Sequence, residues 1–147
     1  MKIAVIGHSL IHIRQVNWLS EVASLGHDVL ILAPGEWKEQ RVESTPWIKI
    51  GEGRYQIHAL RHFGGEDVYR FKFVGAEDVL REFKPDVLYT MQEPNSIVAL
   101  DCSRLPYKKA LFTWENLPSN YTPLGNQVLK EYNLVVCGNG EAQKLVS

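Results

Sequence analysis

Five short apolar runs, each ending in polar or turn-forming residues, constrain the fold of this chain more than any other feature. They occupy residues 2–6 (KIAVI), 28–33 (DVLILA), 86–90 (DVLYT), 109–113 (KALFT) and 134–137 (LVVC). Short apolar runs of this kind are typical of strands that are buried on both faces of a parallel sheet. We therefore expect these five runs to be strands of one largely buried sheet.

Segments with helical periodicity separate the runs. Apolar side chains recur three and four residues apart over 16–23 and 76–83, and helices are also expected over 94–104, over 124–132 and from Glu141 onward. Residues 34–65 are interrupted by Gly51, Gly53, Gly64 and Gly65, so we expect an irregular excursion with one or two further strands. The alternation predicts an α/β fold, with a doubly wound, Rossmann-like parallel sheet and helices on both faces.

Size, composition and charge argue against several classes of protein. A chain of 147 residues suits one domain, and 45% hydrophobic with 22% charged residues is typical of a globular protein. The formal net charge of −1 argues against a nucleic-acid partner, because such a partner requires a basic patch. No run approaches the roughly 20 apolar residues of a membrane span, and the N-terminus lacks a convincing signal peptide. We expect a cytoplasmic protein, for which peripheral membrane contact stays open.

Cys102 and Cys137 are far apart in the sequence. Neither belongs to a CxxC motif, and neither has a histidine nearby at metal-ligand spacing. We expect two thiols in a reducing environment and no metal site.

The turns after the strands are where chemistry is expected, because ligands of doubly wound sheets bind beyond the carboxyl ends of the strands. The first turn reads Gly7-His8-Ser9. A glycine permits a tight turn, and the amides at the start of the next helix can bind an anion or a sugar hydroxyl. A plain strand-to-helix turn is the alternative, in which His8 is a hydrogen-bonded structural residue rather than a ligand-binding or acid–base group.

The turn after residues 86–90 places Gln92, Glu93 and Asn95 at the same edge of the sheet. Amides and carboxylates of this kind hold polyhydroxylated ligands through several hydrogen bonds. The alternative is that Glu93, Asn95 or Ser96 caps the helix that follows.

The turn after residues 109–113 presents an indole, a carboxylate and an amide in succession, at Trp114, Glu115 and Asn116. An aromatic face beside hydrogen-bonding groups suits sugar recognition, although a tryptophan alone is as often a core residue. In the last turn Asn139 and Glu141 flank a glycine, and helix capping is there the simpler interpretation than ligand contact.

Several common motifs are absent. The chain has no GxGxxG, no GxxxxGK[ST] and no HExxH, which disfavours a dinucleotide-dependent reductase or epimerase, a P-loop enzyme and a metalloenzyme. No Ser/His/Asp order can be singled out, which weakens a hydrolase interpretation. The residues by themselves indicate an α/β domain with a polar ligand site at one edge of its sheet.

The order of these pieces resembles the N-terminal domain of the group 1 (family 4) glycosyltransferases, which have the two-domain GT-B architecture. The matching segments are MKIAVIG at the start, LSEVASLGHDVLILAP at 19–34, FKPDVLYT at 83–90, LFTWENLP at 111–118 and YNLVVCGNGEAQKLV at 132–146. The last two segments are the more specific ones.

The resemblance implies a retaining enzyme that transfers a sugar from a nucleoside-diphosphate sugar to an acceptor hydroxyl, usually without an essential metal and with no further cofactor. Residues 1–147 would be a single acceptor-side domain. A C-terminal domain, not among these residues, would hold the nucleotide-sugar donor. We therefore expect the 147 residues alone to be unable to transfer sugar. The alternative hypothesis is a stand-alone module that binds a sugar or a nucleotide without catalysis.

The resemblance also carries over to individual positions. Gly7 to Ser9 match the first turn, which in the family approaches the acceptor and the donor phosphate. Residues 114–116 match a region where many members carry a histidine, which is missing here. Asn139 and Glu141 match the element that closes the domain. The resemblance identifies no catalytic residue, and His8 and Glu115 are the candidates.

Overall fold

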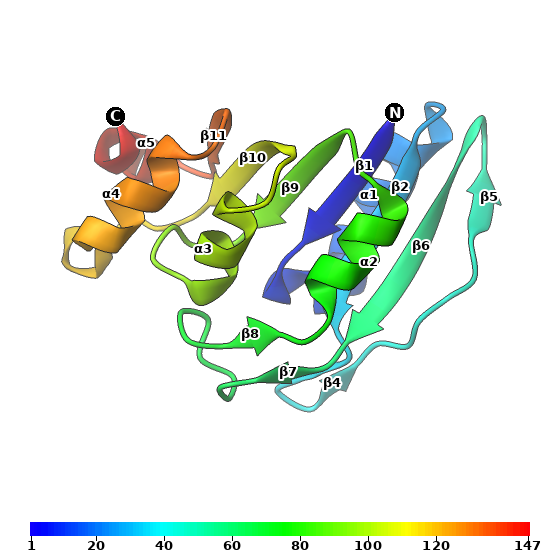
Figure 1. The fold of residues 1–147 in the computed structure, drawn as a ribbon, viewed down its shortest axis with the longest axis horizontal. Helices are drawn as coiled ribbons and strands as arrows, with labels where there is room; N and C mark the ends of the chain where they lie inside the picture. Colours follow the sequence, from blue (N-terminus) through cyan, green and yellow to red (C-terminus); the bar gives the residue numbers. More distant parts are fainter.

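The centre of the molecule is a seven-stranded sheet with helices on both faces (Figure 1). The computed structural model describes residues 1–147. In spatial order the strands are β11 (Leu134–Cys137), β10 (Lys108–Thr113), β9 (Val87–Met91), β1 (Lys2–Ile6), β2 (Asp28–Pro34), β6 (Gly53–Leu60) and β5 (Ile48–Ile50). The five apolar runs are all strands of this sheet, so the expectation of an α/β fold is confirmed.

The sheet is mixed, and the expectation of a wholly parallel sheet was wrong at one edge. All neighbouring pairs from β11 to β6 are parallel, whereas β5 pairs antiparallel with β6. The cause is the short turn at Gly51 and Glu52, which suits a hairpin but is far too short for the crossover that a parallel neighbour requires. Gly51 has φ +54°, in the left-handed region that glycine adopts without a steric penalty.

The order of the parallel strands reverses direction between β1 and β9. Counted along the chain, with β6 as the third and β9 as the fourth, the six parallel strands take the order 3-2-1-4-5-6. This order is consistent with a Rossmann-like fold, in which ligands bind beyond the carboxyl ends of the two strands at the reversal.

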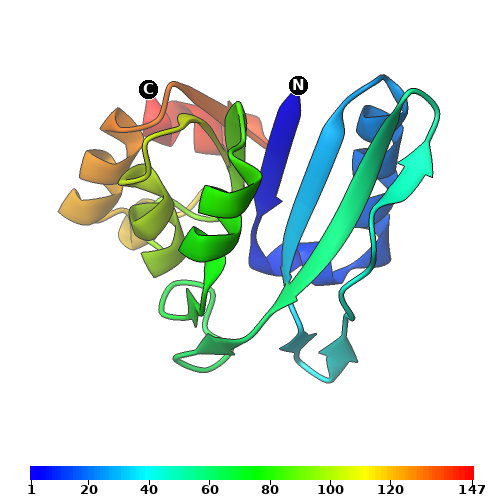
Figure 2. The same cartoon turned by 45° about the vertical axis from the view of Figure 1, so that its right-hand side comes forward.

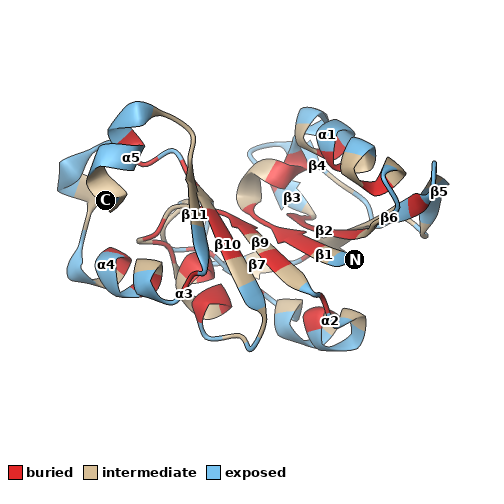
Figure 3. Cartoon of the chain, turned by 90° about the horizontal axis from the view of Figure 1, so that it is seen from above, coloured by how far each residue is buried: buried red, intermediate tan, exposed pale blue.

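Helices cover the two faces in two groups. Helices α1 (Ile13–Ser24) and α5 (Gly140–Val146) lie on one face, and α2 (Ala76–Phe83), α3 (Ile97–Ser103) and α4 (Pro123–Lys130) lie on the other (Figures 2 and 3). Right-handed crossovers explain the division, because the chain moves one way along the sheet from β1 to β2 and the opposite way from β6 to β11. None of these helices is long and apolar enough to cross a membrane.

Alternate residues of the central strands point into two separate cores. Ala4 and Ile6 belong to a core of 17 buried residues beneath α2, α3 and α4, whereas Val5 belongs to a core of nine beneath α1. Each fully buried leucine or isoleucine stabilises the fold by roughly 1.5–3 kcal/mol. The continuous apolar character of the strands follows from this burial on both faces.

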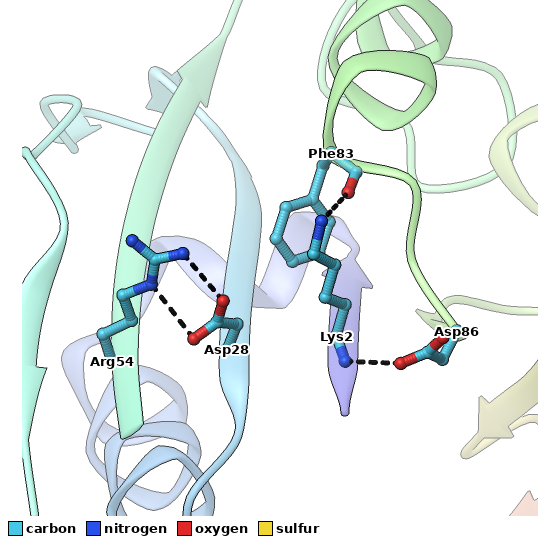
Figure 4. A network of polar contacts seen from close by, with 5 residues as sticks. All are labelled: Lys2, Asp28, Arg54, Phe83 and Asp86. Atoms are coloured by element: carbon cyan, nitrogen blue, oxygen red, sulfur yellow. Dashed lines mark hydrogen bonds and ion pairs between the residues drawn. The ribbon is translucent and has the colours of Figure 1, made fainter. Parts of the chain in front are cut away.

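Charged side chains tie together the amino ends of the strands (Figure 4). Arg54 on β6 donates to both carboxylate oxygens of Asp28 on β2, at 3.0 and 2.8 Å. The Lys2 ammonium donates to the Phe83 carbonyl at 3.2 Å, and the Lys2 backbone N–H donates to the Asp86 carboxylate at 2.7 Å. These bonds join segments that are distant in the sequence, so they stabilise the amino edge of the sheet.

Short elements crowd the opposite, carboxyl edge of the sheet. They are the 3-10 turns η1 (His8–Ile11) and η2 (Pro118–Asn120), the hairpin of β3 (Glu36–Trp37) and β4 (Gln40–Arg41), and the hairpin of β7 (His62–Phe63) and β8 (Lys72–Phe73). The turn between β3 and β4 holds Lys38 and Glu39 at φ +45° and +67°. Such left-handed conformations cost a residue with a side chain about 1–2 kcal/mol.

Candidate functional site

Gly7 ends β1 and passes very close to the end of β9. A Cβ atom at this position would overlap with the carbonyl oxygen of Met91. The backbone of Gly7 is extended, so the requirement for glycine comes from this close approach and not from a special conformation. The first turn and the turn after β9 are therefore pressed together at the point where the strand order reverses.

The side chains of His8 and Gln92 meet at this point. His8 Nδ1 lies 2.7 Å from Gln92 Oε1, and the His8 backbone N–H donates to the same oxygen at 3.4 Å. Gln92 Nε2 donates to the carbonyl of Val68 at 2.6 Å. Gln92 is only 2% exposed, so its amide is used within the chain and does not face solvent.

Aromatic rings surround His8 on the protein side. The His8 ring lies 5.4 Å from the Trp37 ring and 6.3 Å from the Phe71 ring, and Trp37 and Phe71 are themselves in edge contact. Burial lowers the pKa of His8, while the hydrogen bond with Gln92 opposes that shift. Sequence reasoning missed Trp37 and Phe71, because they stand in the irregular excursion and the segment that follows it.

Glu93 follows Gln92 and joins the end of β9 to the end of β10. Its carboxylate accepts from the Thr113 hydroxyl, from the Trp114 N–H at 3.3 Å and from the Glu115 N–H at 2.9 Å. Burial raises the pKa of Glu93, and the nearby Glu115 carboxylate adds to the rise. Glu93 thus holds the start of the 114–122 segment against the sheet.

Glu115 is 5% exposed and lies at the centre of a second network. Its carboxylate accepts from the Tyr69 hydroxyl at 2.5 Å, from Asn120 Nδ2 at 3.0 Å and from the Leu117 N–H at 3.1 Å. Burial is the main cause that raises the pKa of Tyr69, followed by its bond to Glu115. Tyr69 is a further residue that sequence reasoning did not find, since 46 positions separate it from its partner.

Asn95 fastens the far end of the same segment. Its Nδ2 donates to the Asn120 carbonyl, and its Oδ1 accepts from the Thr122 N–H at 3.2 Å and the Thr122 hydroxyl at 3.0 Å. Gly125 lies directly against this side chain, because a Cβ there would overlap with Asn95 Oδ1. The helix after Pro94 is capped by Ser96, which accepts from the Ala99 N–H at 3.1 Å, and not by Glu93 or Asn95.

Trp114 is the exposed member of the site. Its side chain is 57% exposed, and its ring lies in edge contact with Phe112 at 5.4 Å. The indole covers the backbone of Gly138, because a Cβ on that glycine would overlap with the ring. Gly138 therefore supports the indole from behind, in a place where a larger residue would displace it.

The remaining predicted residues fall into two groups. Asn116 is exposed and Ser9 is half-buried, and neither side chain makes a hydrogen bond within the chain. Asn139 caps α5 by accepting from the Ala142 N–H at 2.8 Å, and Glu141 pairs with Lys144 at 2.9 Å. The cap of α5 is thus Asn139, while Glu141 lies in the first turn of the same helix, where the helix dipole favours a carboxylate.

Two buried polar atoms at this edge have no hydrogen-bond partner. They are the Tyr121 hydroxyl and Nδ1 of His62, whose Nε2 lies 2.9 Å from the Glu36 carbonyl. Burial raises the pKa of Tyr121 to about 12. A buried polar atom without a hydrogen-bond partner costs about 1–3 kcal/mol. The polar groups of the carboxyl edge are therefore less completely hydrogen-bonded than those of the amino edge.

Among the candidate residues Trp114 and Asn116 are exposed, whereas Gln92 and Glu115 are buried beneath the surface. A groove of about 460 Å³ lies between α2 and α3, with Phe73, Leu80 and Val98 among its lining residues, and none of the predicted site residues lines it. No group of three or more His, Cys, Asp or Glu side chains lies where it could hold a metal ion. What the arrangement offers a ligand is one supported indole, the edge of His8 and two buried carboxylates beneath.

Comparisons with protein-family models, with curated proteins and with solved structures gave no match to this chain.

Proposed function

We propose that this domain binds a polyhydroxylated acceptor along its carboxyl edge, as the acceptor-side half of a GT-B glycosyltransferase. The observation that carries the proposal is Trp114, whose indole is exposed yet supported from behind by Gly138. An exposed aromatic face at a fixed position is suited to the apolar face of a sugar ring.

The strand order supports the same location for the ligand. Trp114 follows β10, while His8 and Glu93 follow β1 and β9, the two strands between which the order reverses. The three turns lie side by side because β1, β9 and β10 are direct neighbours. A ligand lying across these turns would meet an aromatic face and polar groups together.

The openness of the site supports a two-domain arrangement. Sugar transfer requires that water is kept away from the reacting carbon, and an open surface does not do this alone. In the proposed enzyme a donor domain closes over this edge and brings the nucleoside-diphosphate sugar to the acceptor hydroxyl. As the resemblance implies, the transfer would retain the anomeric configuration, and catalysis would depend on positioning and on stabilising the departing diphosphate.

Tryptophan fluorescence tests the proposal on the chain as it stands. We would titrate the protein with methyl glycosides, with disaccharides and with nucleoside-diphosphate sugars. At least one neutral sugar should give a saturable change in the parent protein. Trp114→Phe should lose that change, whereas Trp47→Phe, which alters a tryptophan far from the carboxyl edge, should keep it.

Three outcomes would count against the proposal. Binding that survives unchanged in Trp114→Phe would remove Trp114 from the site. Binding of nucleotides but of no neutral sugar would favour a nucleotide-binding module instead. Sugar transfer by residues 1–147 alone, measured with the same donors and acceptors, would contradict the requirement for a second domain.

A further inference from the structure

We infer that Gln92 is a positioning residue that keeps a proton on His8 Nδ1, so that His8 meets a ligand through the lone pair of Nε2. The group that His8 contacts is then a hydroxyl or another neutral donor, and not a phosphate. The inference deepens the proposed function, on which it rests for the nature of the ligand. It also changes the interpretation of Gln92, which the sequence analysis placed among the residues that contact the ligand.

Two neighbours determine which way the Gln92 amide points. The Val68 carbonyl can only accept a hydrogen bond, so the atom facing it at 2.6 Å must be the amide nitrogen. The His8 backbone N–H can only donate, so the atom facing it at 3.4 Å must be the amide oxygen. Both requirements give the same orientation, and a rotation of the amide would violate both.

The orientation of the amide then determines where the proton of His8 lies. Gln92 Oε1 has no hydrogen to donate, and His8 Nδ1 approaches it to 2.7 Å. A bond at that distance requires a donor, so Nδ1 carries the proton. In a neutral imidazole the other nitrogen, Nε2, is then the acceptor.

His8 Nε2 is free to meet a ligand. It makes no hydrogen bond within the chain, and it is not among the buried polar atoms that lack a partner, so it reaches solvent. The rings of Trp37 and Phe71 pack against the His8 ring, and neither side chain makes a hydrogen bond to it. The lone pair therefore faces outward at the point where the strand order reverses.

The charge state of the ring disfavours an anionic partner. Burial lowers the pKa of His8, and the nearby Lys38 in the β3–β4 turn and His12 before α1 add to the lowering, whereas the bond to Gln92 raises it. At neutral pH the ring is uncharged, and a lone pair repels the oxygens of a phosphate dianion. A hydroxyl can instead donate to Nε2.

Nitrogen-15 NMR of the histidine rings tests the proton position directly. In the parent protein at neutral pH, His8 should be in the Nδ1–H form, in contrast to the Nε2–H form that a free imidazole side chain prefers. His8→Asn identifies the signals. An Nε2–H form of His8 in the parent protein would overturn the inference without any need for a ligand or an activity.

Substitutions at Gln92 test its role. Gln92→Glu places a carboxylate against Nδ1 and should raise the midpoint of His8 titration by about one pH unit or more. Gln92→Leu removes the acceptor and should abolish the preference for the Nδ1–H form. Gln56→Leu is the matched control, because Gln56 also donates from its side chain to a backbone carbonyl, that of Thr45 at 2.9 Å, but lies on β6 away from His8. A His8 midpoint that stays unchanged in Gln92→Glu would contradict the inference.

Inorganic phosphate serves as the probe for the ligand class. At neutral pH phosphate should leave the His8 Nε2 signal unchanged, and a shift of that signal to the doubly protonated form would overturn the inference. The neutral sugar identified by fluorescence should move the same signal while the Nδ1–H form persists. If His8 shows the expected form but no sugar binds, the proposed function fails and the assignment of Gln92 stands.

Discussion

The two edges of the sheet are built in different ways although the same strands form both. At the amino edge Arg54 donates to both carboxylate oxygens of Asp28, and Lys2 donates to the Phe83 carbonyl (Figure 4). The Trp47 ring lies 4.6 Å from the Arg54 guanidinium and stacks on the Phe83 ring at 5.7 Å. At the carboxyl edge an indole is exposed, a histidine nitrogen is free, and two buried polar atoms lack partners.

The two edges differ in how completely their polar groups are hydrogen-bonded. Polar groups that are fully paired contribute to the fold and leave nothing for a ligand. A buried polar atom without a partner costs free energy that a ligand able to hydrogen-bond to it could recover. The unpaired polar atoms lie at the carboxyl edge, where we propose the ligand site.

Alanine substitutions at Gly7 and Gly53 should give the largest effects and should separate the edges. Each new Cβ would overlap with backbone, at the Met91 carbonyl for Gly7 and at the Ala23 and His27 carbonyls for Gly53. Because backbone cannot move aside easily, we expect each variant to lose about 2 kcal/mol or more of the free energy of unfolding, measured by urea denaturation.

Ligand binding by the same two glycine variants is the sharper comparison. Under conditions where both remain folded, Gly7→Ala should weaken sugar binding, because it displaces His8 and the end of β9. Gly53→Ala should bind normally. Equal binding by both variants would show that the amino and carboxyl edges do not differ in function.

Tryptophan replacements should give effects of intermediate size. At the amino edge the replacement should lower stability, and at the carboxyl edge it should mainly abolish ligand binding. Trp47→Ala removes contacts with Phe83 and Arg54 and should cost about 1–2 kcal/mol of unfolding free energy. Trp114→Ala removes a side chain that is 57% exposed and should cost about 0.5 kcal/mol, while binding is lost. Thermal unfolding measured beside the sugar titration would decide, and a larger stability loss at Trp114 than at Trp47 would reverse the comparison.

The pH dependence of stability should show the smallest effect, with opposite signs at the two edges. The bond to Arg54 lowers the pKa of Asp28 below its ordinary value of 3.8, so its contribution is present above pH 3.8 and is lost as the pH falls below it. Burial raises the pKa of Glu93 above its ordinary 4.5, so the folded state holds an extra proton just above pH 4.5 and stability falls as the pH rises there.

Asp28→Asn and Glu93→Gln isolate these two slopes. Asp28→Asn should flatten the acid limb of the stability curve by about 1 kcal/mol or less, because the ion pair is partly exposed. Glu93→Gln should flatten the decline above pH 4.5, whatever its effect on the absolute stability. Urea denaturation between pH 3 and pH 7 measures both, and slopes of the same sign at the two residues would contradict the assignment.

The sequence by itself determined the five apolar strands and the five helices, whereas it predicted only one or two strands in residues 34–65, where the structure has five. The apolar runs predicted β1 and β11 at the observed residues, and the stripe of Ala76, Val79, Leu80 and Phe83 predicted α2, because local hydrophobic periodicity reports burial directly. It also determined that the turns holding His8, Glu93 and Trp114 gather at one edge, since parallel strands have their carboxyl ends on the same side.

Only the tertiary structure decided which of those side chains are free. Gln92 and His8 are 84 residues apart in the sequence, and Tyr69 and Glu115 are 46 apart, so no local pattern could show that these pairs bond to each other. The same holds for Asn95, whose side-chain amide is hydrogen-bonded to the backbone of residues 120–122. A residue type states which bonds a side chain is able to make, and the packing of distant segments decides which of those bonds are left for a ligand.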